Sequence, residues 1–148
     1  MSTVLLLNGP NLNLLGKREP HLYGETTLKE IESNFKQSAI AFGLVADCIQ
    51  SNSESILIES VHAASSKGTE AIVINPGAYG HTSVALRDAF LGTGLPFVEV
   101  HLSNVFAREE FRSRSLLSDV AIGLISGFGE KSYDLGLQAI LAYLQKNN

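Results

Sequence analysis

Side chains that can transfer protons or bind a small acid gather in three polar segments, each following an apolar run. The first segment contains Asn11, the second contains Asn75 and His81, and the third contains His101 and Ser103. Amide, imidazole and hydroxyl groups bind polar molecules, and an imidazole also exchanges protons near neutral pH. Asparagine and glycine form ordinary turns as well, but histidines are not turn formers. A shared binding cleft is therefore the favoured interpretation.

The second segment is the richest in turn-forming residues. It spans 75–83 and follows the β-branched run at 71–74, as a loop follows a buried strand. A proline and two glycines would end the strand, and Thr82 or Ser83 can cap a following helix. In an open parallel sheet this is the carboxyl edge, where ligands bind, so the segment marks the expected cleft.

The third segment offers a carboxylate, an imidazole and two backbone donors. Glu99 precedes His101 by two residues, so both side chains would point to the same face of a strand. Glu99 could then orient the imidazole ring. The backbone N–H groups of Leu102 and Ser103 could hold a substrate carboxylate.

Arginines follow this segment at Arg108, Arg112 and Arg114. Arg108 and Arg112 are four residues apart, which predicts that they share one face of a short helix near 109–113. Either guanidinium could bind a substrate carboxylate in fork geometry. Exposed ion pairs with the acidic residues between them are the more common arrangement, and the spacing does not distinguish the two.

The polar segment 16–24 is long for a connection between a strand and a helix, and it could form a mobile lid. It carries Arg18 and Tyr23. A phenol with an ordinary pKa near ~10 is only about 0.1% ionised at neutral pH, and a guanidinium held against it favours the tyrosinate. Tyr23 could then act as a general base. The alternative, which the segment alone favours, is a solvated lid with an inert tyrosine.

Composition and missing motifs exclude several kinds of protein. The net charge of −4 over 148 residues gives no electrostatic reason to expect nucleic acid or an anionic membrane as a partner. No apolar stretch approaches the roughly 20 residues of a membrane span. Cys48 is the only cysteine and the histidines lack ligand spacing, so we expect no metal and no disulfide. The loop after the first strand has no dinucleotide-binding or P-loop motif, so we expect no such cofactor. The N-terminus has no basic segment and does not resemble a signal peptide, and a cytoplasmic protein is the simplest interpretation.

Apolar runs alternate with helical patterns along the whole chain. The expected strands are 4–7, 44–49, 71–75, 97–101 and 121–126, and the expected helices lie near 28–39, 58–64, 84–91, 109–113 and 132–145. Several runs are apolar at successive positions, as in parallel strands covered on both faces. The alternation predicts one α/β domain over 1–148, a flavodoxin-like, doubly wound, five-stranded parallel sheet in the order 2-1-3-4-5 within a three-layer sandwich.

Taken together, these segments resemble the type II 3-dehydroquinate dehydratases of the shikimate pathway. The resemblance rests on four stretches in the same order, LNGPNLN at 7–13, REP and YG within 18–24, NPGAYGHTS at 75–83 and HLSN at 101–104. It extends over essentially the whole chain. It implies the flavodoxin-like fold and the loss of water from 3-dehydroquinate to give 3-dehydroshikimate, through an enolate, on the route to chorismate and aromatic amino acids. The family uses no metal, no cofactor and no Schiff-base lysine.

The resemblance also implies catalytic roles. Tyr23 would remove the proton next to the ketone, and Arg18 would keep Tyr23 ionisable and stabilise the transition state. His101, with Glu99 behind it, would protonate the leaving hydroxyl. Asn11 would help to steady the enolate. A base, an enolate stabiliser and a separate acid are the groups that such an elimination needs.

Further matches concern substrate binding and assembly. The matching substrate-binding positions are Asn75, His81, Asp88, Arg112 and the backbones of Leu102 and Ser103. In the family Asp88 reaches the site of a neighbouring subunit, which implies a trimeric unit, usually four of them in a homododecamer. The chain departs from the family at Phe106, where histidine is common, and at Ser113 and Arg114. These departures concern the rim and the subunit contacts, not the reaction.

Two interpretations from other classes stay open. A flavodoxin-like binding or signalling domain could hold a small acid without reacting it, and it would not need an activated phenol at Tyr23. A regulatory scaffold is the other alternative. Biosynthetic use and quinate catabolism employ the same reaction, so the sequence does not separate them.

Overall fold

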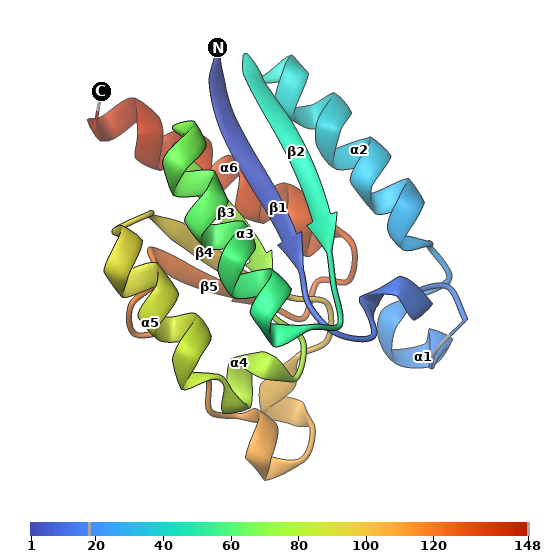
Figure 1. Cartoon of the computed structure of the whole chain (residues 1–148). Helices are drawn as coiled ribbons and strands as arrows, with labels where there is room; N and C mark the ends of the chain where they lie inside the picture. The colour runs from blue at the N-terminus through green and yellow to red at the C-terminus, as the bar shows by residue number, and fades with distance from the viewer. Residues whose placement is uncertain (18, 148) are drawn as a thin grey trace.

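The computed structural model describes residues 1–17 and 19–147, apart from the side chain of Tyr23, and it forms a parallel sheet between two layers of helices (Figure 1). The strands are β1 (Ser2–Asn8), β2 (Leu44–Gln50), β3 (Ala71–Asn75), β4 (Phe97–His101) and β5 (Gly123–Ser126). All neighbouring strands pair in parallel, in the order β2-β1-β3-β4-β5. The predicted fold and its strand order are confirmed.

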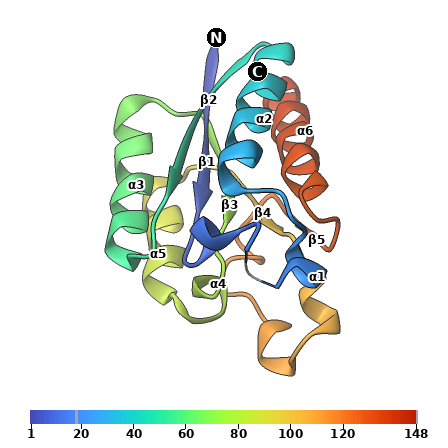
Figure 2. The ribbon, with the colours of Figure 1, turned by 90° about the vertical axis from the view of Figure 1, so that its right-hand side faces the viewer.

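Long helices cover both faces of the sheet, as Figure 2 shows from the side. They are α2 (Leu28–Ala41), α3 (Glu54–Lys67), α5 (Val84–Thr93) and α6 (Lys131–Asn147). Helices α2 and α6 pack on one face, and α3 and α5 pack on the other. The short elements are α1 (Pro20–Tyr23), α4 (Tyr79–Thr82) and the 3₁₀ turns Leu12–Leu14, Val105–Ala107 and Glu110–Arg112.

The central strands are buried on both faces because alternate side chains point into opposite helix layers. In β1, Val4 and Leu6 belong to the core under α2 and α6, whereas Leu5 and Leu7 belong to the core under α3 and α5. All four side chains are at most 3% exposed. Each stabilises the fold by roughly 1.5–3 kcal/mol because it leaves water. Polar side chains are therefore concentrated where the strands end.

The carboxyl ends of the strands lie at one edge of the sheet (Figure 1). The register puts Asn8 of β1 directly beside Asn75 of β3, and Ile74 beside Glu99 of β4. The loops that leave these ends are thereby gathered into one region. The helix after the β3 loop also begins as predicted, because Ser83 accepts a hydrogen bond from a backbone N–H of the first turn of α5 at 2.9 Å.

The connection from β4 to β5 differs from the prediction. The helix expected near 109–113 is only the 3₁₀ turn Glu110–Arg112, and Arg108 precedes it with an extended backbone, at φ −105° and ψ −160°. The prediction that Arg108 and Arg112 share a helical face is therefore wrong. This connection instead forms two short 3₁₀ turns, Val105–Ala107 and Glu110–Arg112, and the extended backbone at Arg108 between them prevents a continuous helix.

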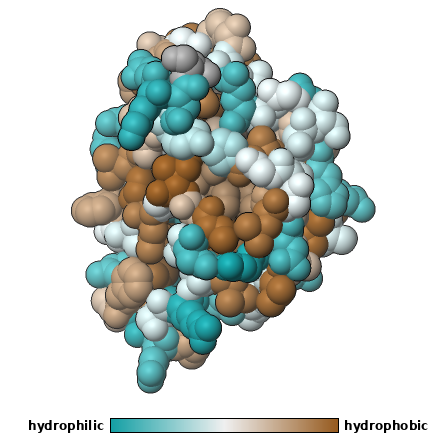
Figure 3. Space-filling view, turned by 90° about the vertical axis from the view of Figure 1, so that its left-hand side faces the viewer, coloured by the Kyte–Doolittle hydropathy of each residue, from teal (hydrophilic) through white to brown (hydrophobic). Residues whose placement is uncertain are grey.

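One surface, next to the edge strand β5, is rich in apolar side chains (Figure 3). A hollow there is lined by Phe90, Leu91, Gly94, Leu95, Pro96, Phe97, Val120, Ala121, Ile122 and Tyr143. Leu91 is 55% exposed and Ile122 is 40% exposed. Exposed apolar surface of this kind is typical of contacts between protein chains.

Candidate active site

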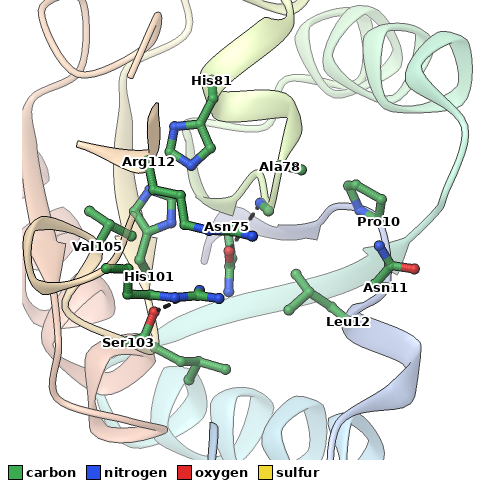
Figure 4. A pocket seen from close by; sticks show the side chains of 13 residues that line it. Pro10, Asn11, Leu12, Asn75, Ala78, His81, His101, Ser103, Val105 and Arg112 are labelled. Atoms are coloured by element: carbon green, nitrogen blue, oxygen red, sulfur yellow. Dashed lines mark hydrogen bonds between the residues drawn. The ribbon is translucent and has the colours of Figure 1, made fainter. Parts of the chain in front are cut away.

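A cavity of about 200 Å³ opens where β1, β3 and β4 end. Its lining is formed by Pro10, Asn11, Leu12, Asn75, Gly77, Ala78, His81, His101, Leu102, Ser103, Val105, Arg108 and Arg112. Figure 4 shows Pro10 and Asn11 on one wall and His101 and Arg112 on the other, with Asn75 between them. The three polar segments therefore meet around one cavity. Two arginines and two histidines in its lining make it a site suited to an anion such as a carboxylate.

The predicted site residues fall into three groups. Those that line the cavity are Asn11, Asn75, His81, His101, Leu102, Ser103 and Arg112. Glu99 lies behind His101 and is fully buried, whereas Asp88 is exposed on α5 and is not part of the lining. Arg18 and the side chain of Tyr23 lie outside the described residues. The catalytic and binding roles of all these residues stay predictions.

Glu99 is the centre of a buried hydrogen-bond cluster. Its Oε2 accepts a hydrogen bond from His101 Nε2 at 2.5 Å, and its Oε1 accepts bonds from the hydroxyls of Ser115 at 3.0 Å and Ser118 at 2.7 Å. Burial alone would raise the pKa of Glu99, but the hydrogen bonds from the imidazole and the two serines outweigh it and hold the pKa below its ordinary value. Glu99 is therefore a charged carboxylate at neutral pH.

The charge on Glu99 determines which nitrogen of His101 can meet a ligand. A carboxylate only accepts hydrogen bonds, so Nε2 carries the hydrogen of the His101–Glu99 bond. Nδ1 is then the nitrogen left for chemistry in the cavity. An imidazole is a common general acid–base group, so Nδ1 is the atom of His101 that can exchange a proton with a ligand.

His81 is oriented in the same way by a different partner. Its Nδ1–H donates to the carbonyl oxygen of Arg114 at 2.7 Å, so Nε2 is the nitrogen that a ligand can reach. The ring stacks on His101, with 6.3 Å between the ring centroids and 15° between the planes. The two imidazoles therefore form one face of the cavity, each held by a residue outside the lining.

Two arginines provide the positive charge of the cavity. Arg108 Nη1 donates to the Ser103 hydroxyl at 3.3 Å, and the Arg108 side chain is only 12% exposed. Arg112 Nε donates to Glu109 at 2.8 Å. Arg112 therefore also forms an ion pair with a neighbouring acidic residue, which is the other arrangement that the sequence left open. Arg108 was predicted only as one of several candidate arginines. Its four-residue spacing to Arg112 was the available signal, although the spacing does not reflect a helix.

Backbone N–H groups of the loop after β1 donate hydrogen bonds to the end of β3 and to the segment that follows β2. The Gly9 N–H donates to the Asn75 carbonyl oxygen at 2.8 Å, and the Asn11 N–H donates to Asn52 Oδ1 at 2.9 Å. Asn11 has a left-handed backbone, with φ +68°, which asparagine tolerates better than most residues. These contacts hold the Asn11 wall against the Asn75 loop.

Gly9 allows this close approach, and Gly9→Ala is expected to destabilise the protein by about 2 kcal/mol. A Cβ at Gly9 would lie 2.3 Å from the Pro76 carbonyl oxygen, a backbone atom that cannot move aside cheaply. The free energy of unfolding from urea titrations measures the effect. Gly92→Ala is the matched control, because a Cβ there meets nothing within 4 Å and alanine favours the helix interior. Equal stability of Gly9→Ala and the wild type would contradict the tight contact.

Sequence reasoning missed the partners behind the site. Ser115 and Ser118 bind Glu99, and the Tyr133 hydroxyl accepts a hydrogen bond from Asn75 Nδ2 at 2.9 Å. Asn8, beside Asn75, accepts a hydrogen bond from Tyr133 at 2.6 Å. The position of Asn8 at a strand end was a usable signal. Tyr133 gave none, because it lies in an amphipathic helix pattern far along the chain.

Among residues 1–17 and 19–147, no group of three or more histidine, cysteine, aspartate or glutamate side chains is arranged to hold a metal ion. Burial raises the pKa of the Cys48 thiol to about 12, so this thiol is a poor nucleophile. In the same part of the chain, no helix has the length and apolar character that crossing a membrane requires.

Comparisons with known proteins agree with this geometry. The family model described as Dehydroquinase class II matches residues 2–141. A 3-dehydroquinate dehydratase from Xanthomonas euvesicatoria is 58% identical over 147 residues, which cover 99% of each chain. The structure of a type II dehydroquinase from Propionibacterium acnes has a TM-score of 0.91 at 39% identity, and covers 96% of this chain and 97% of its own. One from Butyrivibrio crossotus has a TM-score of 0.92 at 39% identity, covering 95% and 97%.

Proposed function

This chain belongs to the class II dehydroquinase family, and we propose how its residues perform the reaction of that family. The protein is a hydro-lyase of the shikimate pathway that removes water from 3-dehydroquinate to give 3-dehydroshikimate. The observation that carries the mechanism is the buried pair of Glu99 and His101 at the wall of a cavity lined by arginines.

We propose that two residues divide the proton transfers. Tyr23 removes the proton beside the ketone, and His101 protonates the leaving hydroxyl through Nδ1. The bond from His101 Nε2 to Glu99 supports this assignment, because it leaves Nδ1 for the substrate. Arg18 favours the tyrosinate form of Tyr23 and stabilises the charge of the transition state. Asn11, on the wall opposite His101, helps to steady the enolate oxygen.

The remaining residues of the cavity bind the substrate. The carboxylate of 3-dehydroquinate is held by the backbone N–H groups of Leu102 and Ser103 and by Arg112. Asn75 and His81 bind its hydroxyl groups through the amide and through Nε2. Their membership of the cavity lining supports these roles.

We further propose that the chain, a single domain over 1–148, works in an assembly of identical subunits in the cytoplasm. Asp88 reaches the cavity of a neighbouring subunit, in trimers that associate into a dodecamer. The exposure of Asp88 on α5, away from the cavity of its own chain, supports a role in trans. The apolar surface next to β5 supports contacts between copies.

Mixing the purified protein with 3-dehydroquinate tests the function directly. We expect the absorbance of a conjugated enone to rise after dialysis against a chelator and without any added cofactor. The same preparation after heat denaturation is the control. Binding of 3-dehydroquinate in a calorimeter without any rise in absorbance would favour a binding domain over an enzyme.

A further inference from the structure

A buried hydroxyl joins the two asparagines at the ends of β1 and β3. The Tyr133 O–H donates to Asn8 Oδ1 at 2.6 Å, and the Tyr133 hydroxyl oxygen accepts a hydrogen bond from Asn75 Nδ2 at 2.9 Å. The exposed fractions are 0% for Asn8, 3% for Asn75 and 2% for Tyr133. The three residues come from β1, β3 and α6, so this contact is made only in the folded protein.

Strand geometry explains why the asparagines meet this helix. Side chains alternate along β3, and Asn75 shares the face of Val73, which packs in the core under α2 and α6. Helix α6 approaches the sheet closely at Gly136, where a Cβ would lie 2.9 Å from Val100 Cγ1 and 3.1 Å from Val73 Cγ1. Tyr133 is almost one turn before Gly136, and it is thereby brought under the ends of the strands.

The donors and acceptors of this cluster fix the direction of the Asn75 amide. Burial raises the pKa of the Tyr133 phenol, so the hydroxyl keeps its proton and gives it to Asn8. Its oxygen then accepts one N–H of Asn75. On the other side of the amide, Asn75 Oδ1 accepts a bond from the Gly77 N–H at 3.2 Å. Two anchors hold the amide, and one N–H of Nδ2 is left for a ligand.

We propose that Tyr133 is a positioning residue for the dehydration, which holds the Asn75 amide so that its second N–H is offered to a hydroxyl oxygen of the substrate. This inference rests on the proposed function, in which Asn75 binds the substrate. Tyr133 does not touch the substrate, because it is not part of the cavity lining. Its effect passes through Asn75 alone.

Steady-state kinetics of Tyr133→Phe test the proposal. The variant keeps the ring and removes only the hydroxyl, so Asn75 keeps a single anchor. We expect KM for 3-dehydroquinate to rise about tenfold while kcat stays within about threefold, since binding is weakened without loss of a reacting group. Ser132→Ala is the matched control, because the buried Ser132 hydroxyl accepts a bond from the residue 128 N–H and touches neither asparagine. An unchanged KM in Tyr133→Phe, or an equal rise in Ser132→Ala, would overturn the proposal.

A double variant separates positioning from a general structural role. If Tyr133 acts through Asn75, then Tyr133→Phe should change KM less than twofold when Asn75 is already alanine. A full tenfold rise in that background would contradict the proposal. If Tyr133→Phe does not fold, Asn8→Ala removes the acceptor of the same hydroxyl, and this variant must then raise KM.

A measurement without turnover keeps this inference separate from the proposed function. In the ligand-free protein, the side-chain N–H protons of Asn75 should exchange with water at least about tenfold faster in Tyr133→Phe than in the wild type. Nitrogen-15 NMR follows this exchange directly. Unchanged exchange would overturn the positioning role even in an active enzyme. Faster exchange in Tyr133→Phe than in the wild type, together with no turnover by the wild type, would support the contact and refute the reaction.

Discussion

Tyr23→Phe is expected to abolish measurable turnover, a loss of roughly a thousandfold or more, while substrate affinity stays within about tenfold. The substitution removes the oxygen that takes the proton and leaves the aromatic ring. A binding domain would lose nothing from this change, because it has no proton to remove. Enone absorbance gives kcat, and calorimetry with 3-dehydroquinate gives the affinity. Retained turnover would contradict the assignment of the base.

Other tyrosines do not replace Tyr23 in this role. Burial raises the pKa of Tyr133, and its hydroxyl is committed to two asparagines. The hydroxyl of Tyr79 donates to the Asn52 carbonyl oxygen at 2.6 Å. Tyr143→Phe is the matched control, since Tyr143 lies beside the apolar hollow next to β5 rather than at the cavity. We expect this control to keep the wild-type kcat and KM.

The fold was predictable because its signals are local. Apolar residues on successive positions, as at Ile72 and Val73, identify strands buried on both faces. Helical spacing between such strands predicts crossovers, and crossovers of one hand leave few strand orders. The same reasoning located the cavity, since residues at the carboxyl ends of parallel strands, such as Asn75 and His101, must lie at one edge.

The partners of the site residues were not predictable in the same way. The contact between Tyr133 and Asn8 joins residues 125 positions apart, and no pattern near either residue indicates it. Arg108 and Arg112 were assigned to one helical face from their spacing. The chain instead forms two short 3₁₀ turns, and the backbone at Arg108 between them is extended. Spacing predicts a face only when the element between the residues is regular.

Glu99→Gln is expected to lower kcat about a hundredfold and to change KM only a few-fold. Glutamine keeps the shape of Glu99 and can still bind the ring of His101 through one hydrogen bond. It cannot supply the negative charge that stabilises a ring protonated on both nitrogens. Proton transfer from His101 to the leaving hydroxyl would then proceed without the charged partner and would be slower. Glu59→Gln, an exposed position on α3, is the control and should match the wild type.

Glu99→Gln is also expected to change how the stability of the protein depends on pH. The folded protein holds the pKa of Glu99 below its ordinary value of 4.5, so the carboxylate stabilises the fold above that pH. This contribution is lost as the pH falls through the lower pKa of the folded state. The urea midpoint of Glu99→Gln should therefore lie further below that of the wild type at pH 7 than at about pH 3.

An equal difference between the urea midpoints of Glu99→Gln and the wild type at both pH values would contradict a charged Glu99. A loss of turnover would then have to come from altered packing around His101. If the difference between the two urea midpoints disappears at acid pH and turnover is also lost, both effects come from the charge of Glu99. Ser118→Ala refines the test, because it removes a hydrogen bond from the carboxylate without removing the charge. It should lower kcat by less than Glu99→Gln, since His101 keeps its charged partner.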